Sequence, residues 1–224
     1  MRVIAIDGPA ASGKSSTAAL VARRLGWAHL DSGALYRALT LAALDHLGEG
    51  WRGTRIVALA EELPVRLVRV GDAFRPEVAG VDVGEAIRSA RVTARVSELA
   101  AIPEVRAWVN AQQRQRAAEH PGGVVVDGRD IGTVVFPDAP LKVFLTAAPD
   151  ERARRRLSQR GEALETEHVR RESQVLEARD RADASRPVAP LRPAADAVRL
   201  DTTTLSLDEQ VARIVALARQ RFPG

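Results

Sequence analysis

The residues whose types and spacing could do chemistry begin at Gly8, where the chain reads Gly-Pro-Ala-Ala-Ser-Gly-Lys-Ser. This phosphate-binding pattern follows the apolar run Val3–Asp7 and precedes an Ala/Leu-rich stretch, as a strand-loop-helix unit requires. Glycines let backbone N–H groups face a polyphosphate, and the next helix points the positive end of its dipole at the same anion. We therefore predict a loop for a nucleoside triphosphate, formed by Gly8, Pro9, Ala10, Ala11, Ser12, Gly13, Lys14, Ser15 and Ser16.

Lys14, Ser15 and Asp127 are the predicted charged and metal-binding groups at this loop. The ammonium of Lys14 lies near the β- and γ-phosphates in such loops, and the Ser15 hydroxyl can bind Mg²⁺. Asp127 ends the apolar run Val124–Asp127, which places a second Mg²⁺ ligand beside the loop. The alternatives are a glycine turn that binds nothing and a strand-end turn residue at Asp127.

Two further strand ends carry residues suited to an anion. Asp31-Ser32-Gly33 is followed one turn later by Arg37, so a helix N-terminus and a guanidinium could hold a phosphate. The same residues could instead be an ordinary helix cap and a solvated arginine. Arg129 and Asp130 follow Gly128 at the edge where open α/β sheets bind ligands. They are candidates for substrate contact, unless they only neutralise one another.

Arginines crowd two later stretches of the chain. The first stretch holds Arg152, Arg154, Arg155 and Arg156. Helical spacing places Arg152 and Arg156 on one side, where their like charges repel unless an anion or carboxylates compensate. The second stretch interleaves arginine with aspartate: Arg179, Asp180, Arg181, Asp183 and Arg186. We assign Arg181 to solvent and predict that the others belong to a lid that closes over a transferred phosphoryl group.

Short apolar runs rich in Val and Ile alternate with stretches of helical spacing, which predicts an α/β fold with a parallel sheet covered on both faces. The predicted core strands are Val3–Asp7, Ala28–Leu30, Val124–Asp127, Leu141–Leu145 and Ala197–Leu200. The predicted helices include Lys14–Leu25, Gly33–Leu47 with one apolar stripe of Leu35, Leu39, Ala43 and Leu47, and a last helix with a capping box at Ser206 and Glu209.

Residues 63–84 depart from this alternation. They contain short β-like pieces, Val65–Val70 and Arg75–Val83, separated by glycine turns, and so predict a small strand-rich insert beside the main sheet. Ala86–Ala118 returns to helical spacing and is broken near Pro103.

Composition limits the possible classes. The chain has 224 residues, 46% of them hydrophobic and 28% charged, which is typical of a globular protein. Its net charge of +4 is too small to indicate nucleic-acid binding by itself. The chain has no cysteine, so disulfides and thiolate metal sites are excluded, and a reducing compartment is favoured. The N-terminal apolar run is too short for a signal peptide, and no stretch approaches membrane-spanning length, so we expect a cytoplasmic protein.

Four segments together carry a resemblance to a known family: Ile6–Lys14 (IDGPAASGK), Leu30–Arg37 (LDSGALYR), Val126–Pro137 (VDGRDIGTVVFP) and Arg186–Leu191 (RPVAPL). The chain resembles the bacterial cytidylate kinases, which move the γ-phosphoryl group of ATP to CMP or dCMP. The first segment alone indicates only a nucleoside triphosphate. The other three together are narrow, and the resemblance covers nearly the whole chain.

The resemblance implies roles for individual residues. The positions that match readers of the cytosine base are Ser97, Arg106 and Asp130. Those that match contacts to the CMP phosphate are Ser32, Arg37, Arg129 and Arg186, and those that match contacts to the sugar are Arg179 and Asp183. The arginine helix matches a lid over ATP, where we expect Arg154 to contact the donor. The expected catalytic residues are then Lys14, Arg129, Arg154 and Arg186.

The resemblance also implies the organisation of the chain. We expect one kinase domain over 1–224 with a five-stranded parallel sheet, in which 1–63, 84–150 and 187–224 form the core, 64–83 the monophosphate-binding insert and 151–186 the lid. The expected ligands are ATP with Mg²⁺ and CMP or dCMP. We expect a monomer that binds neither nucleic acid nor membrane.

Other classes fit the sequence less well. A P-loop GTPase needs an Asn-Lys-x-Asp guanine reader, but the only asparagine, Asn110, precedes Ala111. A nucleic-acid-dependent ATPase needs stacking aromatics on a basic face, and aromatic residues make up only 4% of the chain. Shikimate and gluconate kinases share the loop but give no reason for the anion corners at Ser32 and Arg129.

Overall fold

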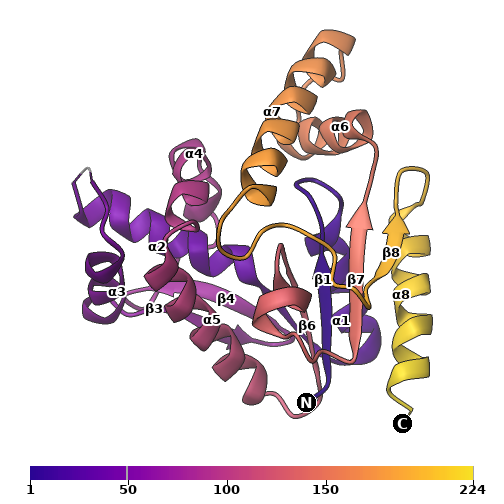
Figure 1. Cartoon of the computed structure of the whole chain (residues 1–224), viewed down its shortest axis with the longest axis horizontal. Helices are drawn as coiled ribbons and strands as arrows, with labels where there is room; N and C mark the ends of the chain where they lie inside the picture. Colours follow the sequence, from indigo (N-terminus) through magenta and orange to yellow (C-terminus); the bar gives the residue numbers. More distant parts are fainter. Residues whose placement is uncertain (49, 224) are drawn as a thin grey trace.

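The computed structural model describes residues 1–48 and 50–223, and its centre is one twisted sheet (Figure 1). The eight strands have the order β3-β4-β2-β6-β1-β7-β8, with β5 paired to β4. The parallel part comprises β2 (Ala28–Asp31), β6 (Val124–Gly128), β1 (Val3–Asp7), β7 (Leu141–Thr146) and β8 (Val198–Asp201). The predicted α/β class and five parallel core strands are confirmed, with shifts of one residue at some strand ends.

Strand β1 shows why the central runs are apolar throughout. Val3 and Ala5 belong to the hydrophobic core on one side of the sheet, whereas Ile4 and Ile6 belong to the core on the other side. Successive side chains of a strand point to opposite faces, so a strand covered on both faces must be apolar at every position. The carboxyl end of β1 therefore comes out of a fully buried strand directly into the glycine loop.

Two sets of helices cover these two faces. The helices on the side of Ile4 and Ile6 are α1 (Lys14–Leu25) and α8 (Leu207–Arg221). Those on the other side are α2 (Ser32–His46), α3 (Gly53–Glu62), α4 (Ala90–Leu99) and α5 (Pro103–Ala118). The predicted capping box of α8 is confirmed, because Ser206 and Glu209 exchange hydrogen bonds. The predicted break before Pro103 is confirmed as well.

The apolar stripe predicted for Gly33–Leu47 is buried at Leu35, Leu39 and Ala43, but a single stripe understates how much of this helix is buried. Helix α2 runs from Ser32 to His46 and is buried over most of its circumference, including Ala34, Ala38 and Ala42. It lies between the sheet and helices α3, α4 and α5, so it has no wide solvent face. The small alanine side chains on the other sides of α2 let the neighbouring helices and the sheet approach it closely. A pattern of large apolar residues does not show that these alanines are buried as well.

The insert extends the main sheet and does not stand beside it. Its strands are β3 (Val65–Val70), β4 (Ala73–Val78) and β5 (Val81–Asp82), which pair antiparallel with one another. Strand β4 also joins β2 in parallel, with Ala73 opposite His29. This junction is a single pair, so the insert is attached to the sheet by little hydrogen bonding.

Helices α6 (Pro149–Arg160) and α7 (Thr166–Ala184) project beyond the carboxyl ends of β1 and β7 (Figure 1). They share a small hydrophobic cluster of their own, separate from the two cores of the sheet: Ala10, Ala153, Leu157, Val169 and Leu176. No helix in the described ranges is long and apolar enough to cross a membrane.

Gly123, just before β6, supplies a test of this packing. Its φ is +123°, and a Cβ atom there would lie 2.4 Å from Cδ2 of the buried Trp27. We expect Gly123→Ala to lower the free energy of unfolding by more than about 2 kcal/mol, since strain and overlap add. Urea denaturation measures the loss.

Gly161 provides the matched control, because its φ is +68° and, in the part of the chain described, no heavy atom would meet its Cβ within 4 Å. We expect Gly161→Ala to cost only about 1 kcal/mol. Equal losses for the two variants would contradict the close approach of Gly123 to Trp27.

Candidate active site

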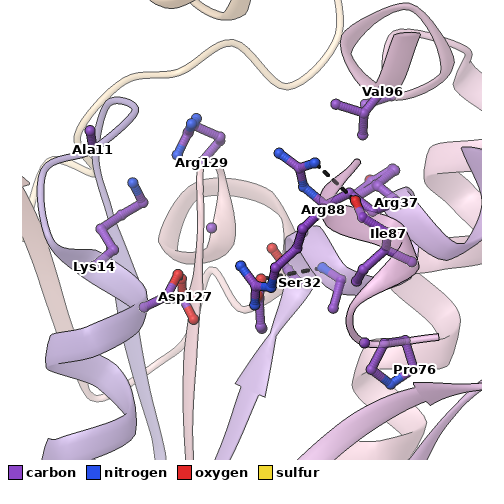
Figure 2. A pocket seen from close by; sticks show the side chains of 18 of the residues that line it. Ala11, Lys14, Ser32, Arg37, Pro76, Ile87, Arg88, Val96, Asp127 and Arg129 are labelled. Carbon is purple, nitrogen blue, oxygen red and sulfur yellow. Dashed lines mark hydrogen bonds between the residues drawn. The ribbon is translucent and has the colours of Figure 1, made fainter. Parts of the chain in front are cut away.

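A cleft of about 900 Å³ opens at the carboxyl ends of β1, β2 and β6. Its walls come from the loop after β1, the start of α2, the insert, α4, the segment after β6, and helices α6 and α7. In Figure 2, Lys14 and Asp127 lie on one side of this space, and Arg37 and Arg88 lie on the other. Segments far apart in the sequence therefore converge on one cavity, as expected at the carboxyl edge of an open α/β sheet.

The glycine loop has the shape that its pattern predicts. Gly8 has a φ of +151°, and a Cβ atom there would lie 2.2 Å from the carbonyl oxygen of Leu145. Gly13, with a φ of +92°, is the N-cap of α1, so no side chain of its own covers the first N–H groups of that helix. These groups remain available to an anion together with the positive end of the helix dipole.

Lys14 is buried at the base of this loop. Its Nζ donates to the carbonyl oxygen of Pro9 at 2.6 Å and to Oγ of Ser12 at 3.4 Å. Burial and the like charge of Arg129 lower the pKa of Lys14 well below its usual value. An anionic phosphate in the loop would favour the charged ammonium and so offset both effects, which suits this position to a negative charge beside Lys14.

Ser15 and Asp127 meet as the sequence predicts. Oγ of Ser15 donates to Oδ2 of Asp127 at 2.6 Å, and both side chains face the cleft. Two adjacent hard oxygen donors fit Mg²⁺, which takes few protein ligands and completes its shell with water and phosphate oxygens. Within the described ranges no group of three or more acidic, histidine or cysteine side chains could hold a metal ion.

His29 is a site residue that the sequence analysis missed. Its Nε2 lies 2.7 Å from Oδ1 of Asp127, the oxygen that Ser15 does not use. Burial by itself would lower the pKa of His29, but the hydrogen bond to Asp127 and the charges of Asp127 and Asp31 raise it. Its signal in the sequence is a polar residue on a strand between buried Ala28 and Leu30.

Arginines form the opposite wall of the cleft. Those that line it include Arg37, Arg88, Arg129, Arg156, Arg179 and Arg186, together with Ser32 at the start of α2. Arg37 is held by the carbonyl oxygen of Ile87 at 3.1 Å and by Oγ1 of Thr93 at 2.9 Å. Burial and the charge of Arg129 lower the pKa of Arg179 to about 10. These arginines concentrate positive charge in a part of the cleft where a second anion can bind.

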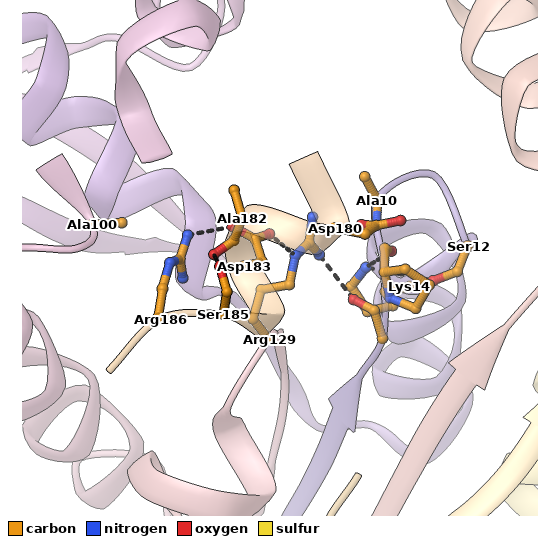
Figure 3. A network of polar contacts seen from close by, with 12 residues as sticks. Ala10, Ser12, Lys14, Ala100, Arg129, Asp180, Ala182, Asp183, Ser185 and Arg186 are labelled. Carbon is orange, nitrogen blue, oxygen red and sulfur yellow. Dashed lines mark hydrogen bonds and ion pairs between the residues drawn. The ribbon is translucent and has the colours of Figure 1, made fainter. Parts of the chain in front are cut away.

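Asp183 is the carboxylate around which this arginine wall is organised (Figure 3). Its Oδ2 accepts from Nε of Arg129 at 2.9 Å, and its Oδ1 accepts from Arg186. Arg129 also donates from Nη1 to the carbonyl oxygen of Gly8 at 3.0 Å, which connects the arginine wall to the glycine loop. The cation of Arg129 is therefore fixed between the two halves of the cleft.

Asp130 does not pair with Arg129, so the reading in which these two residues only neutralise one another is wrong. Asp130 forms a buried ion pair with Arg106 of α5. Arg106 is also held by the carbonyl oxygen of Ala100 at 2.9 Å, and its guanidinium lies 5.6 Å from the ring of Tyr36. Ser97 lines the same end of the cleft.

Several predicted residues lie elsewhere. Arg154 is exposed and is not among the residues that line the cleft, whereas Arg156, two positions later, is. Arg152 does not line the cleft and pairs with Asp180.

In the loop, Ala11, Gly13, Lys14, Ser15 and Ser16 line the cleft, whereas Gly8, Pro9, Ala10 and Ser12 belong to the loop but do not line the cleft. Arg88 is thus a cleft residue that the sequence analysis did not name, and Arg156 is one that it placed in the lid without assigning it a contact.

Asp7 is a buried carboxylate at the junction of β1 and the loop. Its Oδ1 accepts from the N–H of Ile131 at 2.8 Å, and its Oδ2 accepts from the N–H of Gly132 at 2.7 Å. These donors begin the π-helical turn Ile131–Val135 that follows Asp130. Burial outweighs the two hydrogen bonds and raises the pKa of Asp7 to about 6.

This raised pKa predicts a pH dependence of stability. A carboxyl whose pKa is higher in the folded state binds its proton more tightly there, so its contribution to stability falls as the pH rises from about 4 to 7. Relative to Asp7→Asn, which does not titrate, we expect the wild type to lose about 2–3 kcal/mol of unfolding free energy over this range. Urea denaturation of both proteins at several pH values measures the difference. A difference that stays constant with pH would contradict the raised pKa.

Comparison with known proteins agrees with this geometry. The family model described as cytidylate kinase matches residues 4–220. A cytidylate kinase of Stutzerimonas stutzeri is 48% identical, over 98% of this chain and 96% of its own length. One of Pseudomonas fluorescens (strain SBW25) is 46% identical, over 96% of this chain and 93% of its own length. One of Pectobacterium carotovorum is 45% identical, over 97% and 96% respectively.

Among solved structures, an uncharacterized protein from Eubacterium ventriosum has a TM-score of 0.51 at 11% identity, covering 99% of this chain and 100% of that one. That likeness concerns the fold alone. The family model and the relatives, in contrast, span the glycine loop, the arginine wall and the Arg106–Asp130 pair. The chain therefore belongs to the cytidylate kinase family.

Proposed function

We propose that this chain transfers the γ-phosphoryl group of ATP to CMP or dCMP, giving ADP and CDP or dCDP. One observation carries the proposal: the phosphate-binding loop and the buried Arg106–Asp130 pair share a single cleft, with the arginine wall between them. The cleft thus offers a triphosphate site, a second anion site and a polar pair suited to a base, in that order.

The donor triphosphate is assigned to the glycine loop. The N–H groups of Ala11 and Gly13–Ser16 and the ammonium of Lys14 would hold its phosphates. Ser15 and Asp127 would hold Mg²⁺, which when bound would supply positive charge to offset that of the donor phosphates. From α6 we assign the donor contact to Arg156, because Arg154 lies outside the cleft.

The acceptor phosphate is assigned to the arginine wall. Ser32 at the N-terminus of α2 and the guanidinium groups of Arg37, Arg129 and Arg186 face the space beside Lys14. Arg88 faces the same space and is added to this set. We assign Arg179 and Asp183, which are residues of α7 that line the cleft, to the sugar.

The reaction needs little covalent help from the protein. The attacking group is already an anionic phosphate oxygen, so no general base is required, and catalysis consists of alignment and charge stabilisation. Lys14, Arg129 and Arg186 surround the place where the transferred group would pass, because Arg129 bridges the loop at Gly8 and the wall at Asp183. Closure of 64–83 and 151–186 over the two nucleotides would exclude water, which would otherwise hydrolyse ATP.

The base reader is assigned to Arg106 and Asp130, with Ser97. Cytosine offers an N4 amino donor beside the N3 acceptor, whereas uracil offers an O4 acceptor beside an N3–H donor. A carboxylate accepts from the amino group of cytosine and repels the O4 of uracil, while the guanidinium of Arg106 donates to the cytosine acceptors. The buried pair therefore favours cytosine on chemical grounds.

We also infer that the enzyme acts as a cytoplasmic monomer. The absence of cysteine fits a reducing compartment.

The proposed function is tested by measuring ADP release from ATP in the presence of CMP, dCMP, UMP or AMP. We expect rapid release with CMP or dCMP, slower release with UMP and little with AMP. Single-stranded oligonucleotide serves as the control for a nucleic-acid-dependent ATPase. ADP release that depends on the oligonucleotide and not on CMP would overturn the proposal.

Asp130→Asn tests the base reader. Asparagine keeps the size of Asp130 but presents both a donor and an acceptor, so we expect kcat/KM for CMP to fall and the preference for CMP over UMP to narrow by about tenfold. Both monophosphates are assayed at saturating ATP.

The control is Asp82→Asn, a carboxylate that lines the cleft from the insert and pairs with Arg75 at 3.4 Å on the surface. We expect this variant to keep the wild-type preference. If Asp130→Asn lowers kcat/KM for CMP and UMP by the same factor, Asp130 supports Arg106 and does not read the base.

A further inference from the structure

The backbone of Ala10, at the tip of the glycine loop, is held on both sides by charged side chains of the lid helices. Its N–H donates to Oδ1 of Asp180 on α7 at 2.9 Å, and its carbonyl oxygen accepts from Nη1 of Arg152 on α6 at 3.1 Å. Arg152 also pairs with the second oxygen of Asp180. The three groups form a closed polar triangle, which we call the Ala10 clamp (Figure 3 shows Ala10 and Asp180).

The residue after the clamp has an unfavourable backbone conformation. Ala11 has a φ of +56°, in the left-handed region that costs a residue with a Cβ roughly 1–2 kcal/mol. Such a conformation persists only where several contacts of the surrounding structure stabilise it. The turn at Ala11 sets the direction of the N–H groups that follow it in the loop. The clamp at the preceding residue therefore helps to hold the phosphate site in its shape.

Packing supports the same connection. Ala10 is 1% exposed and belongs to the hydrophobic cluster of the lid helices, beside Leu157 and Leu176. Arg152 is 5% exposed, so its charge is removed from water and depends on Asp180 for compensation. The tip of the loop is therefore built into the lid, while the base of the loop is built into the sheet.

We propose that Asp180 and Arg152 are positioning residues for the phosphate donor: by holding both backbone groups of Ala10, they keep the loop tip in its phosphate-binding shape only while α6 and α7 are docked. The proposal rests on the proposed function in that the donor is taken to be MgATP. Neither side chain lines the cleft, so they act through the backbone of Ala10 and not by touching the substrate.

Helix α7 contacts both the glycine loop and the arginines assigned to the acceptor phosphate. Asp180 and Asp183 are one turn apart, and they bond respectively to the loop tip and to Arg129. A single rigid helix thus carries the contact that shapes the donor site and the contact that fixes the acceptor arginines. Docking of α7 assembles both together.

The test replaces the ion pair by apolar residues of similar volume, Asp180→Leu with Arg152→Met. The net charge stays the same, and a buried ion pair exchanged in this way often leaves stability unchanged or raised. Affinities for the magnesium complex of the non-hydrolysable analogue AMP-PNP and, separately, for CMP are measured by titration calorimetry. We expect the affinity for AMP-PNP to fall by at least about tenfold, with CMP affinity within twofold of the wild type.

The matched control is Glu177→Leu with Arg181→Met on the same helix. Those two residues form a surface ion pair at 4.0 Å, with side chains 43% and 72% exposed. We expect this variant to bind both ligands as the wild type does. A clamp variant that binds AMP-PNP as tightly as this control, or that loses affinity for both ligands equally, would overturn the proposal.

A second variant, Asp180→Ala, decides the question if the double variant does not fold. Removing a carboxylate near Lys14 would tighten the binding of an anionic donor by electrostatics alone, whereas loss of the clamp weakens it. Weaker binding of AMP-PNP supports the clamp, and unchanged or tighter binding contradicts it. The wild type is assayed first with ATP and CMP: failure there refutes the proposed function, whereas an active wild type with indifferent variants refutes only the clamp.

Discussion

The crowding of positive charge in one cleft is the constraint on which the rest of this structure depends. Lys14 and the arginine wall must lie close enough to hold two polyanions, and in the free protein they repel one another. The lowered pKa values of Lys14, Arg156 and Arg179, each caused first by burial, record this cost. The fold offsets part of this cost by placing carboxylates beside Arg106, Arg129 and Arg186.

The carboxylates that pair with these arginines come from different elements of the fold. Asp183 on α7 orients Arg129 and Arg186, Asp130 after β6 orients Arg106, and Asp180 compensates Arg152. Only the pair of Asp183 with Arg186, at the end of α7, joins residues close in sequence; the other pairs join residues more than twenty positions apart. The ion pairs therefore also fix how the lid helices, the acceptor wall and the sheet sit relative to one another.

The network of ion pairs is anchored by hydrogen bonds at the carboxyl edge of the sheet. Asp7 ends β1 and accepts two N–H groups of the turn after β6, and Arg129 donates back to Gly8. Two adjacent parallel strands, β1 and β6, are thus connected where one leads into the glycine loop and the other leads into the segment that carries Arg129 and Asp130. A shift of either loop would break bonds to the other, which keeps the two phosphate sites in register.

The sequence by itself determined the elements that follow from local rules. The glycine loop, helix Lys14–Leu25 and the capping box at Ser206 depend on neighbours within a few residues, and the apolar runs of the central strands follow from burial on both faces. The resemblance of four short segments to a family supplied the names of the candidate site residues. Three of those segments lie at the carboxyl ends of β1, β2 and β6, where side chains from adjacent strands meet, and the fourth follows α7.

Only the tertiary structure decided which charges meet. Arg152, Arg154 and Arg156 are alike in sequence, yet one pairs with Asp180, one is exposed and one lines the cleft, because their directions depend on where α7 packs. The same holds for His29 beside Asp127 and for the buried circumference of α2. Long-range pairing leaves no periodic trace in a single chain, so these partners became visible only once the helices were placed on the sheet.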